Sequence, residues 1–304
     1  MLLFSGSSNR PLTEKIADEL KIAIANSETI RFADGEVRVR IMEEINDQHV
    51  AIVQSFSYHP DSNIMELCEF AEVCRRGKAK KITAVVPYLA YSRQHRAHRA
   101  GETISVKLVA DFMKASGVSD CIVVDLHEEE VVNFFKIPVQ NLSATPVFAE
   151  YIDKNREDFG NDNLVIISPD KGRILEANNL AQTLEVEVAY LDKNRPLDDL
   201  DVISSHTLKS EIKNKDAIIY DDMISTGSTA ASAAKTCIDS GAFRVNLIAT
   251  HALFSRFDAI FWQKAPIDRI VVSDSIAVPQ EKIFPKLEIV SLAAMIAKNL
   301  ANFV

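Results

Sequence analysis

The sequence lacks several features that mark whole classes of protein. No apolar run approaches the roughly 18–20 residues of a membrane-spanning helix, so we expect no such helix. The formal net charge is −9, and this balance argues against general binding to nucleic acid or to an anionic membrane. The segment MLLFSGSSNR has no basic stretch ahead of a long apolar run, so we expect no signal peptide.

Cysteine is also sparse. The four cysteines are Cys68, Cys74, Cys121 and Cys237, and none of their spacings is typical of a metal site or a redox pair. We therefore expect free thiols in a cytoplasmic protein. At 304 residues, with 47% hydrophobic and 25% charged content, the chain is that of an ordinary globular protein with two domains.

Short apolar runs alternate with helical segments along the chain. They lie at 49–56, 80–89, 119–126, 163–170, 187–193, 216–222, 244–251 and 268–275. Apolar runs of this length predict an α/β fold, with strands of a mostly parallel sheet covered by helices. Ligands of such sheets bind beyond the carboxyl ends of the strands, where polar residues such as His127, Asp170 and Asp221 occur.

The two halves of the chain resemble each other. Residues 49–93 and 216–256 share the order strand, loop, helix, glycine and second strand. This repeat predicts two related domains, 1–143 and 144–304. The first half has a basic loop around 93–107 and lacks the carboxylate pair of the second, which indicates divided roles.

The segment YDDMISTGST, 220–229, carries the strongest chemical signal. We expect the strand to end at Asp221 and Asp222, with a small-residue loop entering an alanine-rich helix. Backbone N–H groups and hydroxyls at a helix start suit a phosphate, and Gly227 allows close backbone approach. Carboxylates instead suit sugar hydroxyls or a divalent cation. Ribose 5-phosphate satisfies both, whereas a capped helix with two solvated acids is the alternative.

Seven motifs together resemble the ribose-phosphate pyrophosphokinases, or phosphoribosyl pyrophosphate synthetases, and the segments STG and PDKG resemble their archaeal form. The motifs lie at 4–20, 32–41, 87–96, 123–135, 167–172, 190–195 and 220–229. The resemblance implies two similar phosphoribosyltransferase-type domains, each a mostly parallel sheet flanked by helices. It also implies transfer of the diphosphoryl group of Mg-ATP to ribose 5-phosphate, giving phosphoribosyl pyrophosphate and AMP.

The resemblance further implies the binding roles. The residues for the sugar phosphate are Asp221, Asp222, Ser225, Thr226, Gly227, Ser228 and Thr229. Those for ATP are Phe32, Asp34, Glu36, Arg93, Gln94 and His98. An aromatic face with acceptor groups suits adenine. In this family the adenine motif reaches a neighbouring subunit, so a homo-oligomer is implied. From the residues alone, 31–41 is a strand with a tight turn and 93–107 a solvated basic loop.

The remaining roles implied by the resemblance concern charge. Lys193, Arg195 and Arg93 are the catalytic cations, and the loop Asp170, Lys171 and Gly172 holds the diphosphate. Mg²⁺ is the implied cofactor, with His127 and Asp170 as its ligands. From the residues alone, Lys193 and Arg195 form a solvent-facing basic pair, and His127 is a structural or merely solvated histidine.

The sequence departs from the family pattern at a few positions. His95 and Ser225 stand where the family usually has acids, and Ser228 takes the place of a usual glycine. Because phosphoryl transfer is mostly positioning and electrostatics, we expect activity without the acid at 225. The alternatives are a phosphoribosyltransferase, a non-catalytic regulatory homologue and a generic phosphate-binding module.

Overall fold

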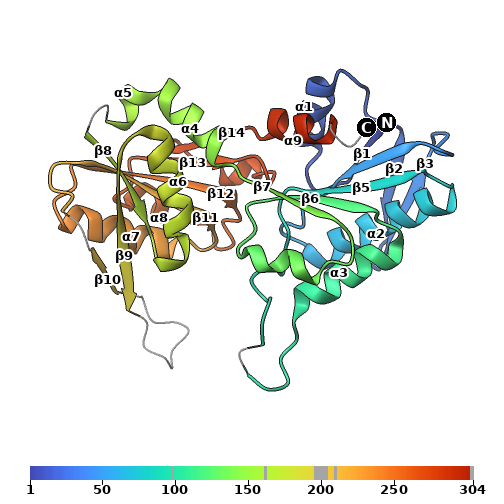
Figure 1. Ribbon diagram of the computed structural model, residues 1–304, viewed down its shortest axis with the longest axis horizontal. Coiled ribbons are helices and arrows are strands. Elements are labelled where there is room, and N and C mark those ends of the chain that lie inside the picture. The colour runs from blue at the N-terminus through green and yellow to red at the C-terminus, as the bar shows by residue number, and fades with distance from the viewer. Residues whose placement is uncertain (98, 161–162, 195–204, 209–210, 302–304) are drawn as a thin grey trace. The chain divides into compact units, whose positions relative to one another are not determined.

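The computed structural model describes the chain except residues 98, 161–162, 195–204, 209–210 and 302–304 (Figure 1). The side chains of 193–194 and 205–207 also lie outside the described part. The chain divides into two compact units. The first contains Met1–Ser143, Ser275–Ala277 and Ser291–Val304, and the second Ala144–Asp274 and Val278–Val290.

The first unit is built on a five-stranded parallel sheet in the order β1-β4-β5-β6-β7. Its strands are β1 (Leu2–Ser5), β4 (His49–Val53), β5 (Lys81–Val86), β6 (Asp120–Val124) and β7 (Val139–Leu142). A separate antiparallel hairpin, β2 (Ser27–Arg31) and β3 (Val37–Ile41), is inserted between β1 and β4. Every residue of β6 is buried, as expected for a strand covered on both faces.

The helices of the first unit form two packed pairs. One pair is α1 (Arg10–Leu20) with α9 (Ala293–Ala301), and the other is α2 (Pro60–Arg76) with α3 (Ser105–Ser116) (Figure 1). A 3₁₀ turn, η1, covers Glu129–Phe134. The helix ends follow local chemistry. Asn9 caps α1 by accepting from the backbone of Leu12, and Gly117 ends α3 in the left-handed conformation.

The second unit is built on a seven-stranded sheet in the order β10-β9-β8-β11-β12-β13-β14. Its strands are β8 (Leu164–Ser168), β9 (Glu187–Asn194), β10 (Ser205–Leu208), β11 (Asp216–Ile224), β12 (Arg244–Ala252), β13 (Arg269–Ser273) and β14 (Leu287–Val290). Only the pairing of β9 with β10 is antiparallel. Every residue of β8 is buried.

Helices flank this sheet as well. They are α4 (Thr145–Lys154), α5 (Arg156–Phe159), α6 (Ile174–Leu184), α7 (Ser228–Asp239) and α8 (Ala259–Lys264), with 3₁₀ turns η3 (Lys171–Arg173) and η4 (Gln280–Lys282). The alanines of α7 pack with one face of β11 and β12, together with the buried Trp262 of α8. Successive side chains of a strand point to opposite faces, and on the other face of β11 Tyr220 packs against Phe148 of α4. The sheet is therefore covered on both faces.

The predicted parallel α/β architecture is confirmed, and each of the eight predicted runs contains a strand. The two units also share one strand order. Each has five parallel strands whose order in the sheet is their order along the chain, with two other strands inserted in the sequence after the first: β1-β4-β5-β6-β7 and β8-β11-β12-β13-β14. The last segment differs from the expected second domain of 144–304, because α9 packs on α1 and belongs to the first unit. The helix buries one face against its partner, and this face includes Ile296 and Leu300.

Among the described residues, none of the helices has the length and apolar character needed to cross a membrane.

Candidate active site

The carboxylate pair lies inside a strand. We expected the strand to end at Asp221 and Asp222, but β11 continues to Ile224, and Asp221 pairs with Ala249 of β12. That expectation is wrong for a physical reason. An acid can lie in a central strand when a cation compensates its charge, and Asp222 has such a partner.

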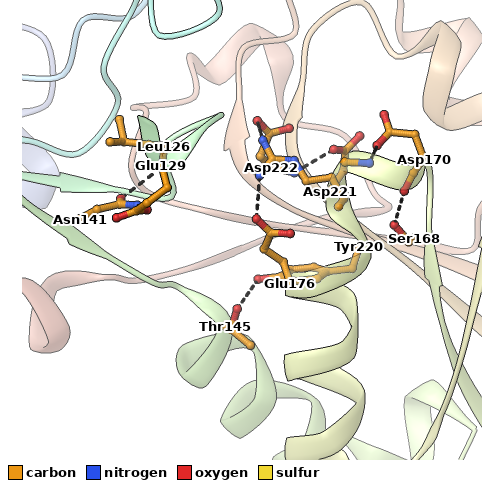
Figure 2. Close-up of polar contacts among 12 residues, drawn as sticks. Leu126, Glu129, Asn141, Thr145, Ser168, Asp170, Glu176, Tyr220, Asp221 and Asp222 are labelled. Carbon is orange, nitrogen blue, oxygen red and sulfur yellow. Dashed lines mark hydrogen bonds and ion pairs between the residues drawn. The ribbon is translucent and has the colours of Figure 1, made fainter. Parts of the chain in front are cut away.

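The partner of Asp222 is Arg173, which ends the turn η3. Its Nη2 lies 2.5 Å from Asp222 Oδ2, and its Nη1 lies 3.1 Å from Glu176 Oε1. Arg173 is 6% exposed and Asp222 is 7% exposed, so this ion pair is buried. Asp222 is therefore not a solvated acid, which excludes that alternative for this residue. Figure 2 shows Asp222 and Glu176 with their contacts.

The pKa values in this region reflect an arginine that is surrounded by several acids. Desolvation acts to lower the pKa of Arg173, but nearby carboxylates outweigh it and raise the pKa. Those carboxylates are Asp222, Glu176, Asp221 and Asp170. The pKa of Asp221 is raised well above its usual value, first by desolvation and then by the charge of Asp222. Asp221 Oδ1 accepts from the backbone N–H of Asp222 at 2.9 Å.

The loop after β11 leads into the start of α7. The N-cap position of this helix is Gly227, which has no side chain to cap it, and the N–H of Ser228 makes a long contact with Thr226 Oγ1 at 3.5 Å. The hydroxyls of Thr226 and Ser228 are 3.0 Å apart, and Ser225 Oγ lies 3.0 Å from Ser255 Oγ. The expected group of small hydroxyl residues at a helix start is therefore present. Such a helix start attracts anions through its N–H groups and its dipole.

The structure gives a reason for a glycine at position 227 that the sequence did not reveal. It adopts φ +87°, and a methyl group there would overlap the ring of Trp262. Trp262 is fully buried and packs against Phe254, Phe261 and Phe284. The absence of a side chain at Gly227 thus lets the loop lie directly on this aromatic cluster.

The expected diphosphate loop follows β8. Asp170 Oδ1 accepts from the backbone N–H of Gly172 at 2.9 Å, and Ser168 Oγ donates to the carbonyl of Asp170 at 2.6 Å (Figure 2). Lys171 Nζ lies 3.2 Å from Asp192 Oδ1 on β9. Lys193 follows Asp192 in β9, where its backbone pairs with His206 of β10. The side chain of Lys193 and the whole of Arg195 lie outside the described residues.

The expected adenine motif lies at the tip of the β2–β3 hairpin. The turn is closed by Phe32 N–H donating to Glu36 O at 2.8 Å, and Asp34 Oδ1 accepts from Glu36 N–H at 3.1 Å. Phe32 is 41% exposed, and Arg38 Cζ lies 5.3 Å from its ring centroid. An exposed aromatic face with adjacent carboxylates is thus present. The strand-with-turn reading from the residues alone is also correct.

The arginine segment begins beyond β5. Arg93 and Gln94 are exposed, and Gln94 Oε1 accepts from Ser105 Oγ at 2.6 Å, which links the segment to α3. Tyr91 OH donates to Asp61 of α2. His98 lies outside the described residues.

His127 follows β6 and is half-buried. Its neighbourhood is held by Asn141, whose Oδ1 accepts from Leu126 N–H at 3.1 Å and whose Nδ2 donates to Glu129 at 2.8 Å (Figure 2). The structure thus brings the Asp170–Arg173 loop and the carboxylates together within the second unit. It places Phe32, Arg93 and His127 at separate points of the first unit.

Comparison with known proteins addresses the family directly. A family model described as the N-terminal domain of ribose phosphate pyrophosphokinase matches residues 1–117, and one described as the phosphoribosyl synthetase-associated domain matches residues 189–303. Ribose-phosphate pyrophosphokinase 1 of Streptococcus pyogenes serotype M3 is 36% identical over 296 residues, 97% of this chain and 92% of that protein. The chain belongs to the ribose-phosphate pyrophosphokinase family.

Two further relatives of this pyrophosphokinase family agree. The ribose-phosphate pyrophosphokinase of Fusobacterium nucleatum is 36% identical over 295 residues, 97% of this chain and 92% of that protein. The crystal structure of the phosphoribosylpyrophosphate synthetase of Mycobacterium smegmatis superposes with a TM-score of 0.91 at 31% identity. The match covers 99% of this chain and 98% of that one. The predicted family and the predicted fold class are both confirmed.

Two residues that shape the site were missed from the sequence. Arg173 was passed over because an arginine after a glycine loop is usually solvated, although Glu176 three residues later was a weak signal for a pair. Trp262 was missed because nothing near it in the sequence connects it with the loop at Gly227.

Proposed function

We propose that the protein transfers the β,γ-diphosphoryl group of Mg-ATP to the anomeric hydroxyl of ribose 5-phosphate, giving phosphoribosyl pyrophosphate and AMP. The supporting observation is a helix start with a glycine at its N-cap position, flanked by hydroxyls and preceded by a carboxylate pair. It occurs in a chain 36% identical to ribose-phosphate pyrophosphokinases. Family membership supports the class of reaction, and the local geometry supports the assignment of residues.

Ribose 5-phosphate binds at the carboxyl end of β11 in this proposal. Its phosphate accepts hydrogen bonds from backbone N–H groups and hydroxyls of the α7 start. The residues concerned are Ser225, Thr226, Gly227, Ser228 and Thr229. The carboxylates of Asp221 and Asp222 serve the sugar hydroxyls, because a hydroxyl donates and a carboxylate accepts. The ion pair to Arg173 holds the carboxylate of Asp222 in place for this task.

ATP is assigned to residues of the first unit. The exposed face of Phe32 stacks on adenine, while Asp34 and Glu36 accept from its amino group. Arg93 binds the phosphates, with support from Gln94 and His98. The exposure of Arg93 and Gln94 favours this role, since a side chain that grips and releases a nucleotide must be accessible.

The chemical step is an in-line displacement at the β-phosphorus of ATP. The anomeric oxygen forms a bond to this phosphorus, the bond between phosphorus and the α,β-bridging oxygen breaks, and the electron pair leaves with AMP. The anomeric hydroxyl gives up its proton to solvent or to a nearby base. Lys193, Arg195 and Arg93 neutralise the charge that builds on the transferred group. The loop of Asp170, Lys171 and Gly172 holds the diphosphate.

Mg²⁺ is the proposed cofactor, and Asp170 is the residue that fits it. Its half-buried carboxylate supplies the hard oxygen donor that Mg²⁺ prefers. His127, proposed as a second ligand, offers nitrogen, which suits this ion less well. Among the described residues there is no group of three or more metal-binding side chains, and Mg²⁺ commonly uses only one or two carboxylates of the protein. The ion would neutralise phosphate charge and orient the β-phosphorus.

Assembly and location complete the proposal. We propose a homo-oligomer in which the adenine motif is shared between subunits. Large apolar side chains exposed on adjacent helices of the first unit, Met65 on α2 and Leu108 and Phe112 on α3, support self-association. Analytical ultracentrifugation tests this, and a monomer at micromolar concentration would contradict it. The four free cysteines favour the cytoplasm.

The experiment that tests the function is incubation of the purified protein with Mg-ATP and ribose 5-phosphate, followed by measurement of AMP. AMP formation that depends on both substrates supports the proposal. A phosphoribosyltransferase would form no AMP but would release pyrophosphate from phosphoribosyl pyrophosphate when a nucleobase is added. Folded protein that binds ribose 5-phosphate without forming AMP would indicate a non-catalytic homologue.

A further inference from the structure

Arg173 connects two parts of the proposed site that are far apart in the sequence. Its backbone belongs to η3, directly after the Asp170–Gly172 loop, whereas its guanidinium lies against Asp222 of β11. The two partners are separated by 49 positions in the chain. The side chain therefore links the loop after β8 with the carboxylates near the end of β11.

The arrangement is more specific than a surface ion pair. Only 8% of the Arg173 side chain and 6% of the Asp222 side chain are exposed, whereas exposed pairs contribute little because water screens them. The guanidinium uses separate nitrogens for Asp222 and Glu176. A planar group with several fixed donors can hold two carboxylates in defined positions, which the single point charge of a lysine cannot do.

The acids near Arg173 determine what the loss of this arginine would do. Asp221 is adjacent to Asp222 and hydrogen-bonds its backbone N–H, so the two carboxylates share one small region. Without Arg173, the like charges of this pair would lose a buried cation, and their positions would no longer be fixed. The second oxygen of Glu176 is buried without a hydrogen-bond partner among the described residues. Because Glu176 is itself an acid, it cannot replace the positive charge of Arg173.

We propose that Arg173 is a positioning residue that holds the Asp221–Asp222 pair in the geometry that recognises the hydroxyls of ribose. This inference rests on the proposed function and deepens it. Arg173 does not contact the substrate; it acts through Asp222. Its effect is therefore on affinity for ribose 5-phosphate, and above all on discrimination between this sugar and 2-deoxyribose 5-phosphate, which lacks one of the hydroxyls.

The main variant is Arg173→Gln, and the chain offers a matched control. Arg244 Nε lies 2.7 Å from Asp216 Oδ1, which is also a buried carboxylate on β11 but at its opposite end. Arg244→Gln thus removes an ion pair from the same strand, one whose arginine side chain is 28% exposed, without touching the carboxylate pair. For both variants we would measure KM and kcat for each sugar phosphate, together with the urea midpoint of unfolding.

The expected result separates positioning from stability. Since a hydrogen bond to a charged group changes an equilibrium by about 10- to 100-fold, Arg173→Gln should raise KM for ribose 5-phosphate by about that factor. KM for 2-deoxyribose 5-phosphate should rise much less, so that the preference for ribose narrows. Arg244→Gln should lower the urea midpoint and leave both KM values within about twofold. If the ratio of the KM values for 2-deoxyribose 5-phosphate and ribose 5-phosphate is the same in wild type and Arg173→Gln, the inference is overturned.

Two further variants keep the test decisive if Arg173→Gln folds poorly. Arg173→Lys retains the charge and is expected to fold, yet it should still narrow the preference for ribose because it cannot hold both carboxylates. In the Asp222→Asn background, Arg173→Gln should have little additional effect on KM, because the two residues act as one unit. Additive effects would contradict an action through Asp222. Absence of AMP formation by the wild type would instead count against the proposed function.

Discussion

Replacing Gly227 with alanine probes the contact between the phosphate loop and the aromatic cluster beneath it. The backbone there has φ +87°, a conformation that costs a residue with a side chain about 1–2 kcal/mol. The added methyl would also overlap the buried ring of Trp262, and overpacking typically costs about 1–3 kcal/mol. We therefore expect Gly227→Ala to lower the free energy of unfolding by about 2–5 kcal/mol.

The control for this prediction is Gly241→Ala, beyond the other end of α7. Gly241 has φ +91°, but the nearest atoms that a methyl group there would meet belong to Lys213, at 3.3 Å or more. In this variant the backbone conformation alone should lower the free energy of unfolding, by about 1–2 kcal/mol, without overlap with an aromatic ring. The difference between the two variants therefore isolates the contact with Trp262.

The assay is urea denaturation followed by tryptophan fluorescence. Trp262 is the single tryptophan of the chain, so the signal reports on the packing beneath this loop. With an m-value of about 2–3 kcal/mol per molar, Gly227→Ala should lower the midpoint by about 1–2 M. Equal midpoints for Gly227→Ala and Gly241→Ala would refute the argument that Trp262 excludes a side chain at Gly227.

Three further predictions concern charge and stacking. Lys193→Ala should reduce kcat for AMP formation by about 10²–10³-fold without changing the urea midpoint, whereas unchanged kcat would remove Lys193 from the catalytic cations. The pKa of Asp221 is raised in the folded chain. At pH values between the unfolded and the folded pKa, the folded chain therefore binds more protons than the unfolded chain. The contribution of this group to stability falls as pH rises through that window. Asp221→Asn should thus have a urea midpoint at pH 7 equal to or above that of the wild type while losing activity; a lower midpoint at pH 7 would contradict the assigned shift. Phe32→Ala should raise KM for ATP by about tenfold and leave KM for ribose 5-phosphate unchanged, because base–aromatic stacking contributes about 1–3 kcal/mol; a change in the sugar KM alone would contradict the adenine role.

The fold could be predicted from the sequence because its strands are buried on both faces. Runs such as 121–124 and 164–167 are apolar throughout, and this pattern is typical of the strands of covered parallel sheets. The placement of α9 could not be predicted. Its amphipathic pattern shows that it buries one face, but not which unit supplies the partner, and here the partner is α1 near the other end of the chain.

The parts of the site whose residues are contiguous in the sequence could be predicted. The hydroxyl residues of 225–229 and the helix that follows are contiguous, so their juxtaposition needed no tertiary information. The extent of β11 was not predictable in this way. Two adjacent acids usually mark the end of a strand. Here the strand continues through them, and the buried Arg173, 49 positions away from Asp222, is a partner of the second acid.

The most direct test of the central claim is a crystal structure of the protein with ribose 5-phosphate bound. The account predicts that the phosphate lies within hydrogen-bond distance of the backbone N–H groups at the start of α7 and that the ring hydroxyls face Asp221 and Asp222. A sugar phosphate bound elsewhere on the second unit, with the start of α7 free of ligand, would contradict it.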